Sequence, residues 1–197
     1  CLPKERHGTI RLHLRIVQTD GFEASYGGAE ANVAVSLAVL KDPVSFVTKL
    51  PENPVGTAAL NEVRRYGADT SKVVIGGSRL GIYFFEKGTD IRPTNVVYDR
   101  EGSALALAKP EEFHWDEILK DTDIFYFSGV TPAVSENIAK AVLEALKYCK
   151  AHGIETVCDL NYRSKMWDTK KAQSVMSELM NYVTLCIAND EDFESSL

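Results

Sequence analysis

The sequence predicts an α/β protein, built on a parallel sheet with a small β element attached to it. Short runs of β-branched and aromatic residues alternate, from about residue 44 onward, with segments whose apolar residues recur every three or four positions. That alternation is typical of right-handed βαβ units. Residues 10–26 and 80–103 instead have strand-like character without helical segments. We therefore expect one domain over residues 1–197, with an α/β core (27–79 and 104–197) and a β lid (10–26 and 80–103).

Apolar runs place the strands of the core. The run at 44–48 is β-branched and aromatic, and the run at 124–127 is the continuous apolar kind that a strand covered on both faces shows. Further strands are expected at 156–158 and 183–187. In the lid, residues 82–86 and 95–98 flank a turn region at Lys87 and Gly88, which predicts a hairpin.

Capping residues and apolar stripes place the helices. Asn53 followed by Pro54 is typical of a helix start, and Gly67 of a helix end. The inward face of that helix is expected to hold Val55, Ala59, Leu60 and Val63. Ser135 and Asp168 are expected to cap two more helices. The first of these ends at Gly153 and turns Ile138, Val142, Ala145, Leu146 and Cys149 inward; the second turns Ala172, Val175, Met176 and Leu179 inward.

Composition excludes several classes of protein. The net charge of −6, without a basic run, argues against a general nucleic-acid binder. No apolar stretch approaches the roughly 18 residues of a membrane span. The cysteines have no metal-site spacing, and Cys158 and Cys186 lie in apolar runs, so both are expected to be reduced and buried. We expect a soluble, cytoplasmic protein that binds neither nucleic acid nor membrane.

A glycine turn precedes the first helix of the core. Gly27 and Gly28 stand before a run of small apolar residues that extends to Leu40. Glycines allow a close backbone approach, and a helix start offers free N–H groups to a polar ligand. A plain strand-to-helix turn is the alternative interpretation.

Polar residues follow each predicted strand of the core, where ligands of parallel sheets bind. They occupy 128–132, 159–163 and 189–192. Arg163 has a rigid fork suited to a carboxylate or phosphate, although it can equally be a surface arginine. The run from Asn189 to Asp192 can hold Mg²⁺ through one or two oxygens, or can be the acidic first turn of a helix.

The lid adds Tyr83, Tyr98 and Arg100. Aromatic residues in strands usually pack a core, which is the alternative for both tyrosines. Two arginines and two tyrosines offered to one site would suit a polyhydroxylated substrate that carries a carboxylate. The sequence contains no P-loop, dinucleotide-binding or zinc-protease motif.

These segments resemble the ribokinase-like, or PfkB, carbohydrate kinases, over about residues 18–197. Residues 27–32 resemble the sugar-binding glycine turn of that family, and residues 49–56 the segment after its second core strand. Residues 81–83, 98–104, 127–132 and 159–163 are most similar to 2-keto-3-deoxygluconate kinases. The resemblance implies a three-layer α/β/α core with a β lid.

The resemblance also implies a site. The sugar acid would be lined by Gly28, Ala29, Glu30, Ala31, Asn32, Tyr83, Tyr98, Asp99, Arg100, Val130 and Arg163. Asn161 and Arg163 would lie between the sugar acid and the ATP phosphates, with Arg163 stabilising charge in the transition state. Asn189 and Asp192 would lie near the nucleotide and Mg²⁺. A homo-oligomer joined through the lid is expected, because exposed sheet edges tend to be paired or covered.

The sequence lacks two features of that family. Its Gly-Ala-Gly-Asp segment, which supplies the general base, is absent, as are its adenosine-binding loops. We therefore expect a C-terminally incomplete chain that is inactive alone, taken from a kinase that uses MgATP to phosphorylate 2-keto-3-deoxygluconate or a related sugar acid. The alternatives are a non-catalytic sugar-acid-binding remnant and a sister kinase for fructose, ribose or a nucleoside.

Overall fold

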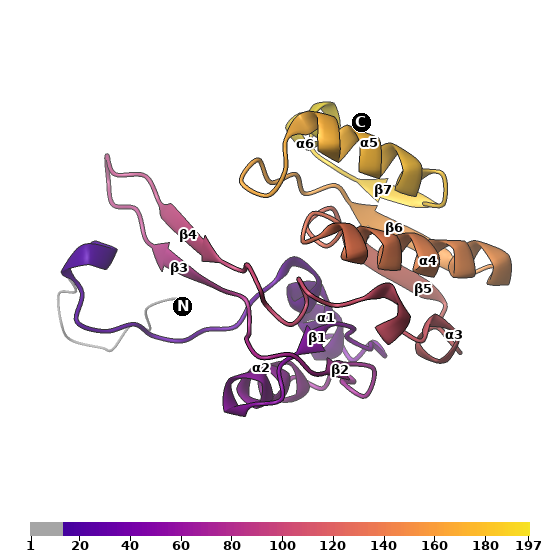
Figure 1. Cartoon of the computed structure of the whole chain (residues 1–197), viewed down its shortest axis with the longest axis horizontal. Helices are drawn as coiled ribbons and strands as arrows, with labels where there is room; N and C mark the ends of the chain where they lie inside the picture. The colour runs from indigo at the N-terminus through magenta and orange to yellow at the C-terminus, as the bar shows by residue number, and fades with distance from the viewer. Residues whose placement is uncertain (1–13) are drawn as a thin grey trace.

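A three-stranded parallel sheet is formed by the C-terminal part of the chain. The computed structural model describes residues 14–197, and its largest sheet has the order β5 (Ile124–Ser128), β6 (Glu155–Asp159), β7 (Leu185–Ile187). Phe127 pairs with Cys158, and Cys158 with Cys186. Helices α4 (Glu136–His152) and α5 (Thr169–Met180) connect these strands (Figure 1). The predicted βαβ order is confirmed, with the last strand beginning at Leu185 rather than at Val183.

The helices around this sheet form as the local signals predict. Ser135 accepts the N–H of Ile138 and begins α4, and Gly153, in the left-handed conformation (φ 72°), ends it. Asp168 caps α5 by accepting the N–H of Lys171. All five predicted inward residues of α4 are buried, and in α5 Ala172, Met176 and Leu179 are buried while Val175 is half-buried. Together with Phe127, Cys158 and Leu160 they make the main hydrophobic core.

The first third of the chain holds α1 (Ala29–Val39), β1 (Lys49–Leu50), α2 (Pro54–Arg64) and β2 (Val74–Ile75). The strand predicted at 44–48 is wrong: that stretch makes one isolated bridge, Ser45 to Asp69, and regular pairing begins only at Lys49. The partner segment turns between Thr70 and Val73, which interrupts the ladder. The sheet formed by β1 and β2 is not hydrogen-bonded to β5–β7 within the described residues.

Helix α2 begins as predicted but turns a different residue inward. The Asn53 side chain accepts the N–H groups of Val55 and Gly56, each at 3.0 Å. Val55 is 53% exposed, so its predicted inward position is wrong. Gly56 is buried in its place, against the carbonyl of Pro51.

The predicted hairpin is confirmed, and it extends away from the core (Figure 1). Strands β3 (Ile82–Glu86) and β4 (Asn95–Asp99) pair antiparallel, with Tyr83 opposite Tyr98. The second predicted strand-like segment, 10–26, forms no strand in its described part, residues 14–26, which holds only a short 3-10 helix, η1 (Ile16–Gln18). It attaches to β3 through side chains instead of a ladder: the Ile16 N–H donates to Glu86, and the Phe22 and Phe84 rings lie 5.2 Å apart.

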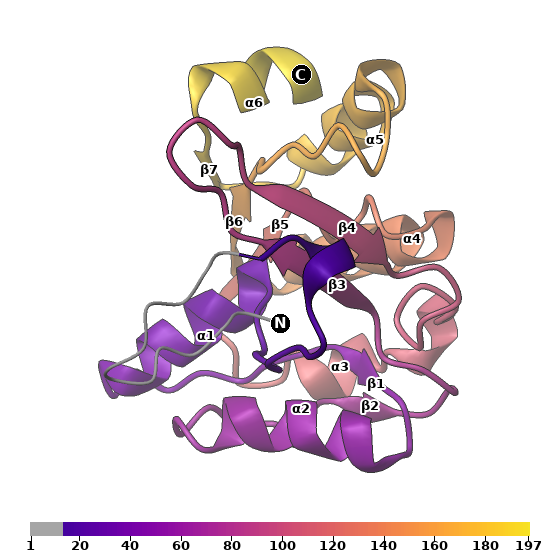
Figure 2. The same ribbon diagram turned by 90° about the vertical axis from the view of Figure 1, so that its left-hand side faces the viewer.

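Short elements complete the chain: η2 (Pro110–Glu112) and α3 (Trp115–Ile118) precede β5, and α6 (Asp190–Ser196) follows β7. Figure 2 shows α1 and α4 on opposite sides of β5 and β6. Cys158 is buried as predicted, and burial raises the pKa of its thiol. Cys186 is a free cysteine as predicted, but its predicted burial is wrong, because β7 pairs only with β6 in the described sheet and all three of its residues are exposed. No helix of the described residues has the length and apolar character needed to cross a membrane.

Candidate functional site

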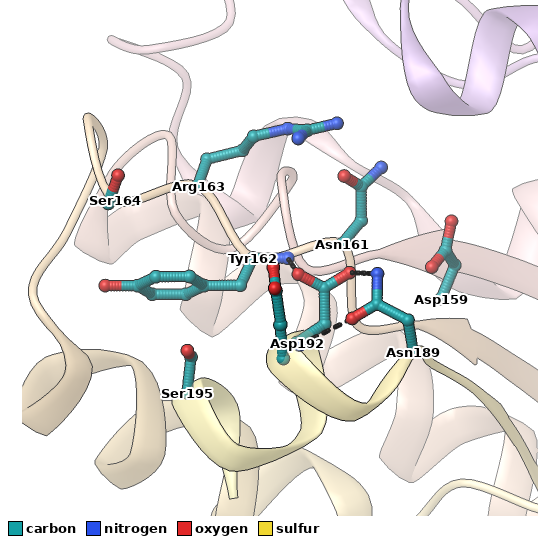
Figure 3. A pocket seen from close by; sticks show the side chains of 9 residues that line it. Asp159, Asn161, Tyr162, Arg163, Ser164, Asn189, Asp192 and Ser195 are labelled. Atoms are coloured by element: carbon teal, nitrogen blue, oxygen red, sulfur yellow. Dashed lines mark hydrogen bonds between the residues drawn. The ribbon is translucent and has the colours of Figure 1, made fainter.

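The carboxyl ends of β5 and β6 meet closely. The N–H of Gly129, the first residue after β5, donates to the carbonyl of Asp159 at 2.8 Å. Beside this junction lies a polar hollow of about 630 Å³. Its wall comes from the end of β6, the loop that follows, and α6 (Figure 3); the residues are Asp159, Asn161, Tyr162, Arg163, Ser164, Asn189, Glu191, Asp192 and Ser195.

Asn189 and Asp192 bind each other and the loop after β6. Asn189 accepts the N–H of Asp192 at 2.7 Å and donates its amide to that carboxylate at 3.0 Å (Figure 3). The second oxygen of Asp192 accepts the N–H of Tyr162 at 3.1 Å. The acidic run is thus the first turn of α6, the alternative weighed from the sequence. No group of three or more His, Cys, Asp or Glu residues placed to hold a metal occurs in the described part of the chain, so these side chains form no protein cage for Mg²⁺.

Asp159 was not among the predicted site residues, although it opens the 159–163 segment. Burial raises the pKa of its carboxyl, and the nearby Asp192 raises it further, with a smaller effect from Glu30. The N–H of Asn161, which donates to this carboxylate, and the Arg163 cation act in the opposite direction. Burial, followed by the charge of Asp159, raises the pKa of Tyr126 to about 12. Negative charge is therefore concentrated at the end of β6, opposite the arginine of the same loop.

Arg163 and Asn161 of this loop have polar side-chain groups left over for a ligand. Arg163 is exposed, and its guanidinium makes no hydrogen bond or ion pair with any residue that the structure describes, while its carbonyl accepts the N–H of Met166. Asn161 has a φ of 36°, which is uncommon for a residue with a side chain and occurs at functional sites. Both side chains extend away from α6 (Figure 3).

The lid contacts this loop through β4. The Tyr83 and Tyr98 rings lie 6.1 Å apart, and the Arg100 guanidinium lies 4.4 Å from the Tyr98 ring centre. Arg100 also donates to the sulfur of Met166 at 3.5 Å, and Lys165 donates to the Val96 carbonyl at 2.9 Å. The predicted lid residues and the Arg163 loop are therefore neighbours.

Asp99 lies beside these lid residues, but its carboxylate is already paired. The partner is Arg79, at 2.7 Å, and the same guanidinium also binds the Asp99 carbonyl at 3.2 Å. The sequence did not indicate this partner, which stands twenty positions earlier and outside the predicted strands. Asp99 therefore has a structural contact that any contact with substrate would have to share.

The glycine turn lies next to the lid and needs no special backbone conformation. Gly28 has a φ of 170°, which any residue adopts, so the backbone conformation of the turn does not require glycine. A Cβ on Gly27 would lie 3.7 Å from the Tyr83 hydroxyl and 3.8 Å from the Asn32 amide oxygen. Ala29, Ala31 and Asn32 lie on the first turn of α1, as predicted.

Glu30, on the same turn, binds the end of β5. Its Oε1 accepts the N–H of Ser128 at 2.9 Å and the hydroxyls of Ser128 and Thr131 at 2.7 and 2.6 Å. Val130 follows, with its N–H donating to the Ser128 hydroxyl at 3.3 Å. The glycine turn thus lies beside the lid, and contacts link the lid to the Arg163 loop and α1 to β5. Asn189 and Asp192 lie on the α6 side of that loop.

Comparison with known proteins identifies the family. The model of the pfkB family of carbohydrate kinases matches residues 9–197. The chain belongs to that family. The resemblance read from the sequence is confirmed.

Its relatives include kinases of several keto-deoxy sugar acids. The crystal structure of 2-dehydro-3-deoxygluconokinase from Thermotoga maritima is 48% identical, with a TM-score of 0.90 over 93% of this chain and 56% of that one. A 2-dehydro-3-deoxygalactonokinase of Haloferax volcanii is 36% identical over 93% of this chain and 57% of its own length. A 5-dehydro-2-deoxygluconokinase of Geobacillus thermodenitrificans is 28% identical over 85% of this chain and 50% of its own length. The PfkB chain described here thus spans about half the length of these relatives.

Proposed function

We propose that the complete protein is an ATP-dependent kinase that phosphorylates a terminal hydroxyl of 2-keto-3-deoxygluconate or a closely related sugar acid. The observation that carries the proposal is the contact between two separate segments that each contain an arginine, Arg100 and Arg163. Arg100 lies on Tyr98 and contacts Met166, three residues after Arg163. A guanidinium is suited to bind a carboxylate or phosphate oxygen in two-point fashion. The names of the relatives above support a sugar acid over a neutral sugar.

The residues divide into a sugar side and a phosphate side. We assign the sugar acid to Gly28, Ala31, Asn32, Tyr83, Tyr98, Arg100 and Val130, with Ala29, Glu30 and Asp99 supporting that side. Arg163, whose guanidinium has no hydrogen-bonding partner in the described chain, and Asn161 face the phosphate side. A preorganised cation there stabilises charge that develops on the phosphoryl group.

Bound MgATP would supply the phosphoryl group, and the side chains present fit it in part. Arg163 and Asn161 offer donors, whereas Asn189 and Asp192 already bind each other and Tyr162. We assign Asn189 and Asp192 to holding the loop beside the nucleotide. Mg²⁺ usually keeps several waters and substrate phosphate oxygens, so it does not require a protein cage.

The same proposal extends to the whole molecule. The complete protein would have a three-layer α/β/α core with a β lid. Its general base would lie outside residues 1–197, so this chain would be inactive by itself. We further propose a homo-oligomer joined through the lid, because the hairpin exposes Ile82, Ile91 and Val97. Light scattering that gives a monomer at micromolar concentration contradicts the oligomer.

Substrate profiling tests the function. ADP release by the complete protein is measured with 2-keto-3-deoxygluconate, its galactonate epimer, 5-dehydro-2-deoxygluconate, fructose and ribose. We expect the highest kcat/KM with one of the two 2-keto-3-deoxy acids, and an Arg100→Ala variant should lose mainly affinity for the sugar acid. Arg65→Ala is the control, since the Arg65 guanidinium contacts Glu62 and Tyr66, which are not among the assigned site residues. Preferred turnover of ribose or fructose contradicts the proposal.

A binding module without chemistry is the competing class. It predicts that the sugar acid raises the melting temperature of the complete protein while ATP does not, because only ligands of the native state stabilise it. Stabilisation by both ligands, together with ADP release, excludes it.

A further inference from the structure

Glu30 makes the densest set of long-range hydrogen bonds at this end of the molecule. One carboxylate oxygen, Oε1, accepts three donors from residues about a hundred positions away: the N–H and hydroxyl of Ser128 and the hydroxyl of Thr131, at 2.6 to 2.9 Å. Hydrogen bonds to an ionised acceptor are stronger than neutral ones. Glu30 also lies in the first turn of α1, where the helix dipole favours a negative charge.

These bonds join the two segments to which sugar contacts were assigned. On one side stand Gly28 and Asn32, before and after Glu30 in the first turn of α1. On the other side, the Ser128 hydroxyl that donates to Glu30 also accepts the N–H of Val130. Ser128 is fully buried at the end of β5, so it is a fixed anchor. The carboxylate of Glu30 therefore sets the position of the glycine turn relative to the β5 loop.

A direct contact of Glu30 with the sugar acid, as the family resemblance implied, fits this geometry poorly. Oε1 already accepts three donors from the protein, which exceeds its two lone pairs, so a contact with the sugar acid could use Oε2 alone. The carboxylate of Glu30, if it faced the carboxylate of a sugar acid, would also oppose binding by charge repulsion.

We propose that Glu30 is a positioning residue: it holds Gly28 and Asn32 of α1 in register with Val130 of the β5 loop and does not itself contact the sugar acid. The inference rests on the proposed function, because it is measured through the sugar. The proposed role of Glu30 divides the sugar site into two sides. The side formed by α1 is held to β5 through Glu30, and the side formed by the lid contacts the core through Arg100 and Lys165.

Steady-state kinetics of the complete protein test this role. Glu30→Ala is expected to raise the KM of the preferred sugar about tenfold or more, with the KM of ATP changed less than about twofold, since only the sugar side loses its register. Glu30→Gln keeps the shape and an acceptor oxygen and should recover most of the affinity. Glu136→Gln is the matched control, because that glutamate pairs with Lys171 at the surface.

Partner variants keep the test decisive if Glu30→Ala does not fold. Thr131→Val removes one donor with little change of volume and should raise the sugar KM alone, by a few-fold. Combined with Glu30→Gln, it should cost less than the sum of the two single effects, because both act on one interaction. Equal changes in both KM values, or an unchanged sugar KM in Thr131→Val at wild-type stability, overturn the proposal. A complex with Glu30 oxygens in hydrogen-bond contact with the sugar acid also overturns it.

The failure of this inference is distinguishable from failure of the proposed function. Absence of turnover by the wild-type protein with every sugar acid removes the function, and the role of Glu30 falls with it. An active wild-type enzyme whose Glu30 variants keep the sugar KM removes only the positioning role.

Discussion

Gly129→Ala is the substitution whose effect follows most directly from the structure. A Cβ at Gly129 would lie 2.1 Å from the Leu160 carbonyl oxygen and 3.1 Å from its carbon. Ordinary contacts begin near 3.4 Å, so β5 and the loop after β6 must separate by about 1.3 Å. Overpacking of this kind costs about 1–3 kcal/mol. The gain from restricting the unfolded chain, about 0.4–1 kcal/mol, offsets part of it.

The same displacement acts on the candidate site. Gly129 precedes Val130, and Leu160 precedes Asn161, so both loops move relative to each other. Misplacement by about 1 Å is enough to lower a rate about 10²-fold. We therefore expect the kcat/KM of the complete protein to fall about 10²-fold, and its free energy of unfolding to fall by about 1–2 kcal/mol.

Two other glycines supply controls for urea unfolding and ADP-release assays. A Cβ on Gly56 would lie 2.1 Å from the Pro51 carbonyl oxygen, which is the same clash away from the assigned site residues. A Cβ on Gly21 would meet nothing within 4 Å. Gly56→Ala should lose stability while kcat/KM stays within about threefold, since it moves no assigned residue, and Gly21→Ala should change neither. Equal losses of kcat/KM in Gly129→Ala and Gly56→Ala would refute the reasoning, because global destabilisation would then explain both.

Three further substitutions separate chemistry from stability. Arg163→Met should lower kcat about 10²–10³-fold, the cost of removing a group that stabilises transition-state charge, and should change the free energy of unfolding by less than about 0.5 kcal/mol because the side chain is exposed; wild-type kcat contradicts its role. Asp159→Asn should raise stability in a pH-dependent way. Since the folded-state pKa of Asp159 is raised, its ionisation destabilises the native state, and that loss develops as the pH rises from the ordinary value through the folded-state pKa. The urea midpoint of the variant should therefore exceed that of the wild type increasingly from about pH 4 upward, and a variant that is less stable at every pH contradicts this. Gly27→Ala should leave the urea midpoint unchanged or higher and raise the KM of the sugar acid; an unchanged KM places the sugar elsewhere.

Local signals were sufficient for the helices and most strands. Each of Asn53, Ser135 and Asp168 sits at a helix start with its side chain bonded to the first turn. A capping residue and the apolar residues of a helix face interact with residues within four positions of them. The local sequence was therefore sufficient to predict these helices. The hairpin from Ile82 to Asp99 is local in the same sense.

The errors arose where the cause lies elsewhere in the chain. The 44–48 segment has strand composition, but its partner turns away after Asp69, and nothing within 44–48 reports that. Cys186 has the apolar neighbours of a buried strand, yet its exposure depends on the order of the strands, which places β7 at the edge of the described sheet. The ligand contacts of Glu30 and Asp99, which the family resemblance implied, stay predictions; the sequence contained no sign of their protein partners, Ser128 and Arg79.

The glycines show how a structure can separate packing from binding. Gly129 and Gly56 are required by the chain itself, because backbone carbonyls occupy the space of a side chain. At Gly27 the backbone has no left-handed conformation, and a Cβ would stand at ordinary contact distance from the Tyr83 hydroxyl and the Asn32 amide. The chain's own geometry therefore gives no reason for glycine there, and the space that its hydrogen leaves open is bordered by two polar groups. A bound polyhydroxylated molecule that approaches the main chain at this point would supply the missing reason, and this supports our proposal that the sugar side of the site lies at the glycine turn.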